Sequence, residues 1–191
     1  MAVLFSELSR RLSPRAAYNA GFASYWLAWC IGFPIWILGP RRAARLLIRG
    51  QRPSASETIL LLLPVAGAVT TELLPNRKKI DMAVALVMAA TGVINGAGEE
   101  LLWRGMFLEA FPNDPLRGLL WPLVGFSLWH LAPQMILPSR LGRWPFVLGA
   151  ALVGSASAIS AWRSGGLRNC LAPHIATDSC RVTAARFRLG R

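Results

Sequence analysis

The sequence predicts an all-α membrane protein, a polytopic transmembrane bundle of about six membrane-embedded helices around a buried polar cavity. The chain has 191 residues, of which 54% are hydrophobic and 16% are charged, whereas a soluble domain usually carries about a quarter charged residues. The mean hydropathy is +0.43. The apolar residues also gather into blocks close to the length of about 20 residues that a helix needs to cross a bilayer. Because a helix satisfies its own backbone hydrogen bonds in lipid, these blocks predict helices.

Six apolar blocks follow one another along the chain, and the fourth and sixth are short for a membrane span. Short blocks are typical of segments that line an internal polar cavity. Proline, glycine and asparagine clusters such as 112–115 separate the blocks. In order, the blocks cover residues 16–38, 57–75, 80–99, 116–131, 144–162 and 167–180.

The chain is expected to divide after a basic loop. Residues 1–56 hold an N-terminal interfacial segment, a membrane anchor and the basic loop, and residues 57–191 form the transmembrane helical core. Before the first block, apolar residues such as Phe5 and Leu8 occur together with Arg10 and Arg11, and this combination favours an amphipathic helix at the membrane surface. The tryptophans of the first block are expected to pack or to face lipid: Trp26, Trp29 and Trp36.

The formal net charge of +12 does not indicate a nucleic-acid-binding protein. The basic residues do not form one stripe with interleaved aromatic residues. They lie instead in the connections between apolar blocks, where they are attracted to the anionic headgroups of membrane lipids. Examples are Arg41, Arg42, Arg45, Arg49, Arg52, Arg77, Lys78 and Lys79, and near the C-terminus Arg181, Arg186, Arg188 and Arg191.

Three ionisable residues lie in or directly after the third block. Glu99, Glu100 and Arg104 occupy a stretch that otherwise predicts membrane-embedded helix, where such side chains are kept mainly when they pair or do chemistry. Glu100 and Arg104 are four residues apart and share a helix face. Glu99 points about 100° away from Glu100 and is therefore free to face a cavity. Small residues just before Glu99 would let another helix approach closely: Gly92, Gly96 and Gly98.

The two histidines of the chain lie in two other apolar blocks. Phe126 precedes His130 by one helical turn, and His174 precedes Asp178 by one turn. Asp178 could therefore accept a hydrogen bond from His174 and fix the orientation of its imidazole ring. Each feature alone has a simple structural explanation, such as a core histidine or a polar pair near the surface. Because together they use every histidine, they predict one shared polar site.

The pattern Glu-Glu-x-x-x-Arg, Phe-x-x-x-His and His-x-x-x-(Asn or Asp), in this order on successive membrane helices, resembles the CAAX prenyl protease and bacteriocin-processing (CPBP, or Abi) family. The resemblance covers about residues 83–180 and implies an intramembrane endopeptidase. A minor departure is Trp103, since phenylalanine or tyrosine usually precedes the arginine. The residues that carry the resemblance are the candidate catalytic set: Glu99, Glu100, Arg104, Phe126, His130, His174 and Asp178.

These residue types can hydrolyse a peptide bond with an activated water. We expect Glu99 to act as general base, His130 to hold the same water and His174 to donate to the oxyanion. The pair of Glu100 and Arg104 would position the helix so that Glu99 points toward the water. Asp178 would orient His174, since an ionised aspartate cannot donate to an oxyanion as an asparagine could.

The cofactor question stays open at this point. No cofactor is favoured, but Glu99, His130 and His174 are an adequate ligand set for zinc with water in the fourth position. The absence of a His-Glu-x-x-His motif favours the metal-free, glutamic-type mechanism. The expected partners are membrane lipids and a membrane-associated protein or peptide substrate, in a bacterial or archaeal plasma membrane.

Two other functions would use the same features. A non-catalytic immunity or regulatory scaffold could keep the fold, although no motif residue is missing here. An ion or proton transporter could use the buried charges as a relay, but it would be expected to show paired repeats, and the sequence has none. The identity of the substrate and the oligomeric state do not follow from the sequence.

Overall fold

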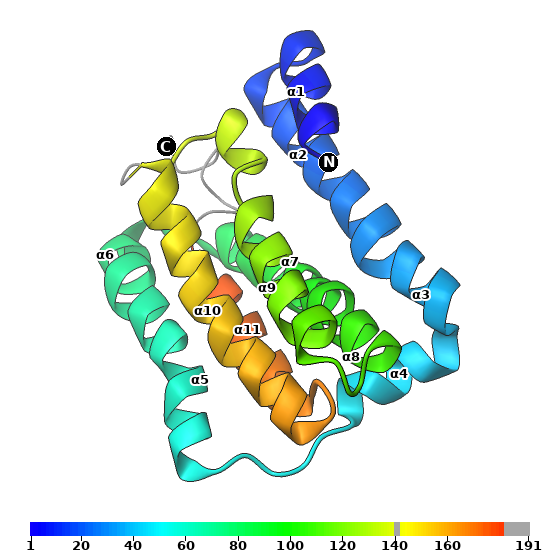
Figure 1. Ribbon diagram of the computed structural model, residues 1–191. Helices are drawn as coiled ribbons and strands as arrows, with labels where there is room; N and C mark the ends of the chain where they lie inside the picture. Colours follow the sequence, from blue (N-terminus) through cyan, green and yellow to red (C-terminus); the bar gives the residue numbers. More distant parts are fainter. Residues whose placement is uncertain (140–141, 182–191) are drawn as a thin grey trace.

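The computed structural model describes residues 1–139 and 142–181, and within these ranges all the regular secondary structure is helical (Figure 1). This confirms the predicted all-α fold class. The basic residues Arg186, Arg188 and Arg191 lie outside the described residues.

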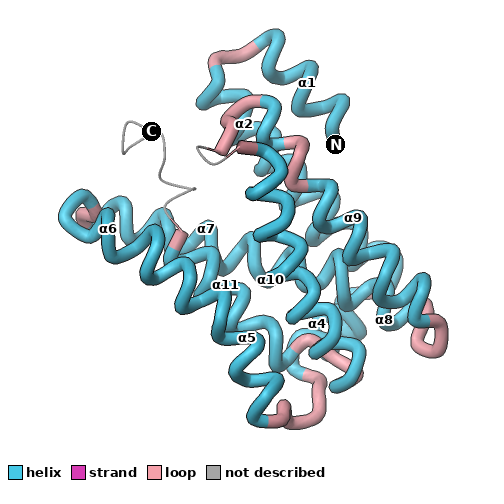
Figure 2. The backbone as a smooth tube through the Cα atoms, turned by 60° about the vertical axis from the view of Figure 1, so that its left-hand side comes forward, coloured by secondary structure: helices cyan, strands magenta, loops and turns pink. Residues whose placement is uncertain are grey.

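The N-terminal part forms a long helix with a short helix folded back against it (Figure 2). Pro14 starts the long helix in the first-turn position that proline favours, and the Ser13 side chain caps it by accepting from the Ala16 amide. Phe5 is fully buried, so α1 packs on the bundle as well as presenting a charged face. The elements are α1 (Ala2–Arg11), α2 (Pro14–Ser24), the π-helical η1 (Tyr25–Gly32), α3 (Phe33–Leu38) and α4 (Pro40–Ile48).

The middle of the chain forms two further long helices that begin with well-formed caps. Ser54 and Glu57 make a capping box at the start of α5, and the Asp81 side chain accepts from the Val84 amide at the start of α7. Such caps satisfy backbone N–H groups that have no partner within the helix. The elements are α5 (Ala55–Ala68), η2 (Val69–Leu73), α6 (Leu74–Asn76), η3 (Arg77–Lys79), α7 (Met82–Glu100), the π-helical η4 (Leu101–Gly105) and α8 (Met106–Ala110).

The C-terminal part contains one long helix between two short ones. α10 ends at Gly165, whose φ of 70° is the left-handed conformation that glycine adopts at helix ends. α11 lies inside the bundle, packed against α7, α5 and α10 (Figure 1). The elements are η5 (Leu116–Leu120), α9 (Trp121–Trp129), η6 (Pro133–Met135), α10 (Arg143–Ser164) and α11 (Arg168–Cys180).

The number of helices long and apolar enough to cross a membrane is four, fewer than the six predicted, in the part of the chain that the structure describes. The apolar blocks at 116–131 and 167–180 fold as α9 and α11, which are too short to qualify. The division of the chain after residue 56 stays a prediction. The four qualifying helices are Pro14–Leu38, Ala55–Lys79, Met82–Ala110 and Arg143–Ser164.

Glycines allow α7 and α11 to pack with their backbones in close approach. A Cβ atom added to Gly92 would lie 2.7 Å from the Ser179 amide nitrogen, and one added to Gly96 would lie 2.9 Å from the Ile175 amide nitrogen. Gly98 makes a similar approach to Cys30 of η1. The close helix approach predicted from these glycines is therefore confirmed, and it brings the end of α7 against α11.

We predict that Gly96→Ala destabilises the protein, because the new methyl group would push α11 away from α7. Overpacking of this kind typically costs about 1–3 kcal/mol. Gly149→Ala in α10 is the matched control, because nothing lies within 4 Å of its Cβ position. Thermal unfolding in detergent measures both variants. Equal melting temperatures for the two would contradict the close packing of α7 and α11.

Candidate active site

The end of α7 carries a fully buried ion pair. Glu100 and Arg104 are almost inaccessible to solvent, and Arg104 Nη1 lies 3.5 Å from Glu100 Oε1, as their spacing predicts. The Arg104 guanidinium also lies 4.0 Å above the centre of the Phe126 ring, and its Nη2 donates to the Gly154 carbonyl over 3.3 Å. Arg104 thus links α7 and η4 to both α9 and α10.

His174 lies between three carboxylates. Its Nδ1 is 2.6 Å from Glu100 Oε1, and its Nε2 is 3.6 Å from Glu99 Oε2 and 3.5 Å from Asp178 Oδ2. Because a carboxylate accepts and Nδ1 must then donate, Glu100 fixes the ring and leaves Nε2 facing the other two acids. The sequence had pointed to Asp178 as the residue that orients His174, whereas the short hydrogen bond of His174 is donated to Glu100.

Glu99 is buried and receives hydrogen bonds on both carboxylate oxygens. Its Oε1 accepts from the Tyr25 hydroxyl over 3.0 Å and from Trp129 Nε1 over 3.2 Å. Its Oε2 accepts from Asn95 Nδ2 over 3.1 Å. Three donors from three different elements therefore hold one carboxylate, with Oε2 directed toward His174.

His130 is held by its own helix. Its Nδ1 is 2.7 Å from the Phe126 carbonyl oxygen, which can only accept, so Nδ1 carries the proton and Nε2 of the neutral ring is an acceptor. The Phe126 ring contacts both imidazoles, edge-to-face, with its centre 4.7 Å from that of His130 and 6.2 Å from that of His174. Phe126 therefore orients His130 through its backbone and contacts both imidazole rings through its side chain.

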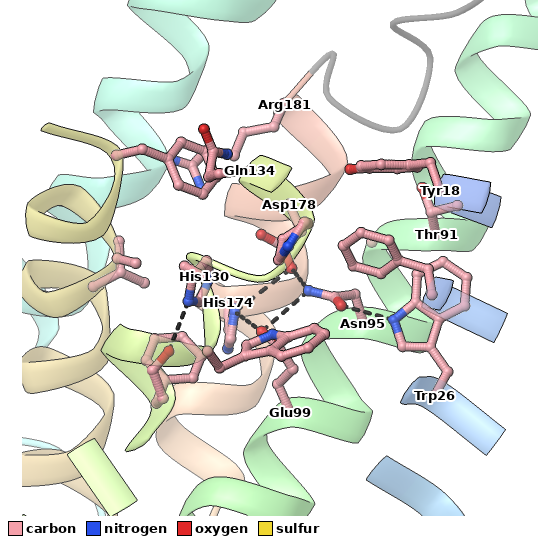
Figure 3. Close-up of a pocket in the computed structure, with 18 of the residues that line it drawn as sticks. Tyr18, Trp26, Thr91, Asn95, Glu99, His130, Gln134, His174, Asp178 and Arg181 are labelled. Atoms are coloured by element: carbon pink, nitrogen blue, oxygen red, sulfur yellow. Dashed lines mark hydrogen bonds and ion pairs between the residues drawn. The ribbon is translucent and has the colours of Figure 1, made fainter. Parts of the chain in front are cut away.

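One cavity of about 400 Å³ contains these groups. Glu99, His130, His174 and Asp178 line it together with aromatic side chains of α2, η1 and α9, and Figure 3 shows Glu99, His174 and Asp178 close together around Asn95. Glu100 and Arg104 lie behind this wall and do not line the cavity. The arrangement is a polar centre in a partly open cavity, with an imidazole acceptor, two carboxylates and space for a small ligand or a short peptide segment.

The group of side chains that could hold a metal ion differs from the predicted set of Glu99, His130 and His174. The ligand atoms of Glu99, His174 and Asp178 lie within 4.8 Å of one another. Among the described residues, His130 is not part of this group. Asp178 takes the place of His130 in this group because it lies one turn after His174 on the same helix, whereas His130 reaches the cavity from the end of α9.

Several residues that hold Glu99 were not predicted from the sequence. Asn95 lies one turn before Glu99 on α7, and this spacing could have identified it. Tyr25 and Trp26 carried no such signal, because they belong to the first apolar block and bond to residues about 70 positions later. Trp26 was expected to pack or to face lipid, but it lines the cavity and donates to Asn95.

A family model described as Type II CAAX prenyl endopeptidase Rce1-like matches residues 81–180 of the chain. This range is a little more than half of the 191 residues. It runs from the cap of α7 to the end of α11 and contains all seven candidate catalytic residues. No curated protein and no solved structure matches the chain significantly.

We predict that Glu100→Gln lowers both stability and activity. The substitution leaves Arg104 charged and buried without a counter-ion, and breaking a buried pair in this way costs about 3–5 kcal/mol in soluble proteins. Glu109→Gln is the matched control, because Glu109 pairs with Arg49 at a distance of 3.1 Å and both side chains are partly exposed; a pair exposed to solvent contributes at most about 1 kcal/mol. Thermal unfolding in detergent compares them, and a Glu100→Gln variant as stable as Glu109→Gln would refute the structural role.

Proposed function

Because the chain belongs to the Rce1-like family of type II CAAX prenyl endopeptidases, we propose that its buried cavity hydrolyses a peptide bond with a water activated by Glu99 and His130. The protein is an integral membrane protein and a CAAX-type intramembrane endopeptidase. The substrate that we propose is a membrane-associated or hydrophobic protein, presented as a peptide segment to the cavity. The observation that carries the proposal is the convergence of Glu99, His130 and His174 on one cavity.

Glu99 acts as the general base in this proposal. Its Oε1 is already occupied by Tyr25 and Trp129, so Oε2 accepts a proton from the water while the water oxygen attacks the scissile carbonyl carbon. A carboxylate oxygen has two lone pairs, and Asn95 uses one of those on Oε2. The proton then passes to the amine nitrogen as the C–N bond breaks, which regenerates the carboxylate.

The two histidines take different roles. His130 Nε2 is an acceptor and holds the second hydrogen of the water. His174, with Nδ1 bonded to Glu100, carries a proton on Nε2 and donates it as a hydrogen bond to the developing oxyanion. The nearby negative charges of Glu100 and Asp178 stabilise the protonated ring. Phe126 and Arg104 are positioning residues, because they hold His130 and Glu100.

A divalent metal ion such as zinc is the alternative. The oxygen and nitrogen donors of Glu99, His174 and Asp178 fit such an ion, and Glu100 on Nδ1 would be the usual outer partner of a ligating histidine. The ion would supply Lewis acidity and a more acidic water. The metal-free mechanism is favoured because the Asn95 amide already donates to both Glu99 Oε2 and Asp178 Oδ2 and so bridges the two carboxylates without an ion.

We predict that Glu99→Gln abolishes cleavage while the protein remains folded. The glutamine can still accept from Tyr25 and Trp129 through its amide oxygen, but it cannot take a proton, and loss of a general base typically costs about 10²–10⁴-fold in rate. Cleavage of a prenylated CAAX-type peptide in detergent, measured beside the melting temperature, tests this. Cleavage at the wild-type rate would mean that Glu99 is not the base.

We predict that chelators leave the activity intact and that Asp178→Asn is tolerated. The asparagine oxygen can still accept from Asn95, so the hydrogen bond over 2.7 Å is kept, and Glu100 still balances the charge of the protonated His174. If a metal were required, a chelator would abolish activity, added zinc would restore it, and Asp178→Asn would lose at least about 10-fold in metal affinity. Peptide cleavage during a chelator titration, with and without added zinc, separates the two mechanisms.

A further inference from the structure

Two adjacent residues of the first helix reach the candidate general base from outside the region that matches the family model. That region begins at residue 81, whereas Tyr25 and Trp26 start η1. The Tyr25 hydroxyl donates to Glu99 Oε1 over 3.0 Å. Trp26 Nε1 donates to Asn95 Oδ1 over 2.8 Å, and Asn95 in turn donates to Glu99. The first helix thus acts on both oxygens of Glu99.

The direction of the Tyr25 hydrogen bond follows from its other partner. Trp103 Nε1 lies 2.7 Å from the Tyr25 hydroxyl oxygen, and an indole N–H can only donate. The hydroxyl proton of Tyr25 is therefore available to Glu99. The Tyr25 ring is also stacked on Trp129, with ring centres 3.8 Å apart, and Trp129 donates to the same carboxylate oxygen. The position of Glu99 Oε1 is thereby fixed by two stacked aromatic donors.

The orientation of the Asn95 amide follows from Trp26 in the same way. Because the indole of Trp26 can only donate, the oxygen of the amide must face it. The amide nitrogen then faces the cavity and donates to Glu99 Oε2 over 3.1 Å and to Asp178 Oδ2 over 2.7 Å. Figure 3 shows this chain of bonds from Trp26 through Asn95 to the two carboxylates. A flipped amide would instead point its oxygen at two carboxylates.

We propose that the first helix completes the active site: Trp26, acting through Asn95, and Tyr25 are positioning residues that aim Glu99 at the water. This inference rests on the proposed function, in which Glu99 is the base. Without the Trp26 donor, the amide is free to flip and Glu99 Oε2 loses its partner. Without the Tyr25 donor, Oε1 keeps only Trp129. In both cases the fold is kept but the carboxylate is no longer held in one place, and misplaced catalytic groups lower the rate of the chemical step.

The first experiment removes one donor at a time and keeps the aromatic ring. Trp26→Phe and Tyr25→Phe should each lower kcat about 10-fold or more, with KM changed less than about 3-fold. Trp29→Phe is the matched control, because Trp29 lies in the same η1 segment and is 44% exposed; its kcat should equal that of the wild type. A wild-type kcat in both test variants would overturn the proposal. A raised KM with unchanged kcat would also overturn it, because Trp26 would then contact substrate.

The second experiment removes the Asn95 amide and tests whether an amide at position 178 restores activity. Asn95→Asp places a third carboxylate beside Glu99 and Asp178 and should reduce kcat about 100-fold or more. Adding Asp178→Asn returns one amide and one carboxylate to positions 95 and 178, and should recover at least about 10-fold of that loss. A double variant no more active than Asn95→Asp would contradict the role of the amide.

The Glu99→Gln variant separates failure of this inference from failure of the proposed function. If Glu99→Gln is fully active, the proposed function itself fails. If Glu99→Gln is inactive while Trp26→Phe and Tyr25→Phe keep wild-type activity, only this inference fails.

Discussion

The hydrogen bond between Glu100 and His174 is the interaction on which the rest of the polar centre depends. It joins two residues that are 74 positions apart and ties α7 to α11 in the middle of the bundle. Glu100 also balances the charge of Arg104, and its second oxygen accepts from the Cys170 thiol over 3.1 Å. Glu100 does not line the cavity, so it is not placed to act as a base, and it sets His174 so that Nε2 faces Glu99. The two adjacent glutamates therefore have different environments although they share one helical turn.

Close helix packing makes this bond possible. An imidazole and a carboxylate meet at 2.6 Å only because α7 presents Gly92 and Gly96 to the backbone of α11. Larger side chains at these positions would separate the helices by more than the hydrogen bond can bridge. Small residues at helix interfaces are a common solution in membranes, where lipid supplies no hydrophobic drive for helices to associate. In this protein they also set the dimensions of the polar centre.

Local spacings in the sequence were sufficient to predict contacts within one helix and the helix face that a neighbouring helix approaches. The all-α class, the Glu100–Arg104 pair and the approach of another helix to the glycines of α7 all follow from such spacings. The number of spans was overestimated because hydropathy does not distinguish a short helix buried inside a bundle, such as α11, from one that crosses lipid. The contacts of Tyr25 and Trp26 could not be predicted, because they depend on how the first helix is rotated against α7. The partners of His174 depended on the same kind of packing.

The order of the elements along the chain has a consequence for how the protein is made. During synthesis the donors of the first helix enter the membrane well before α7 brings Glu99 and Asn95, and α11, the last described helix, brings His174 and Asp178 later still. N-terminal segments fold first as a chain emerges. The aromatic donors are therefore in the membrane before the carboxylate of Glu99, and Glu99 is there before the imidazole of His174. Until α11 has inserted, Glu100 has Arg104 as a partner but lacks His174 and Cys170. A nascent chain thus has no complete polar centre until its last described helix is in place.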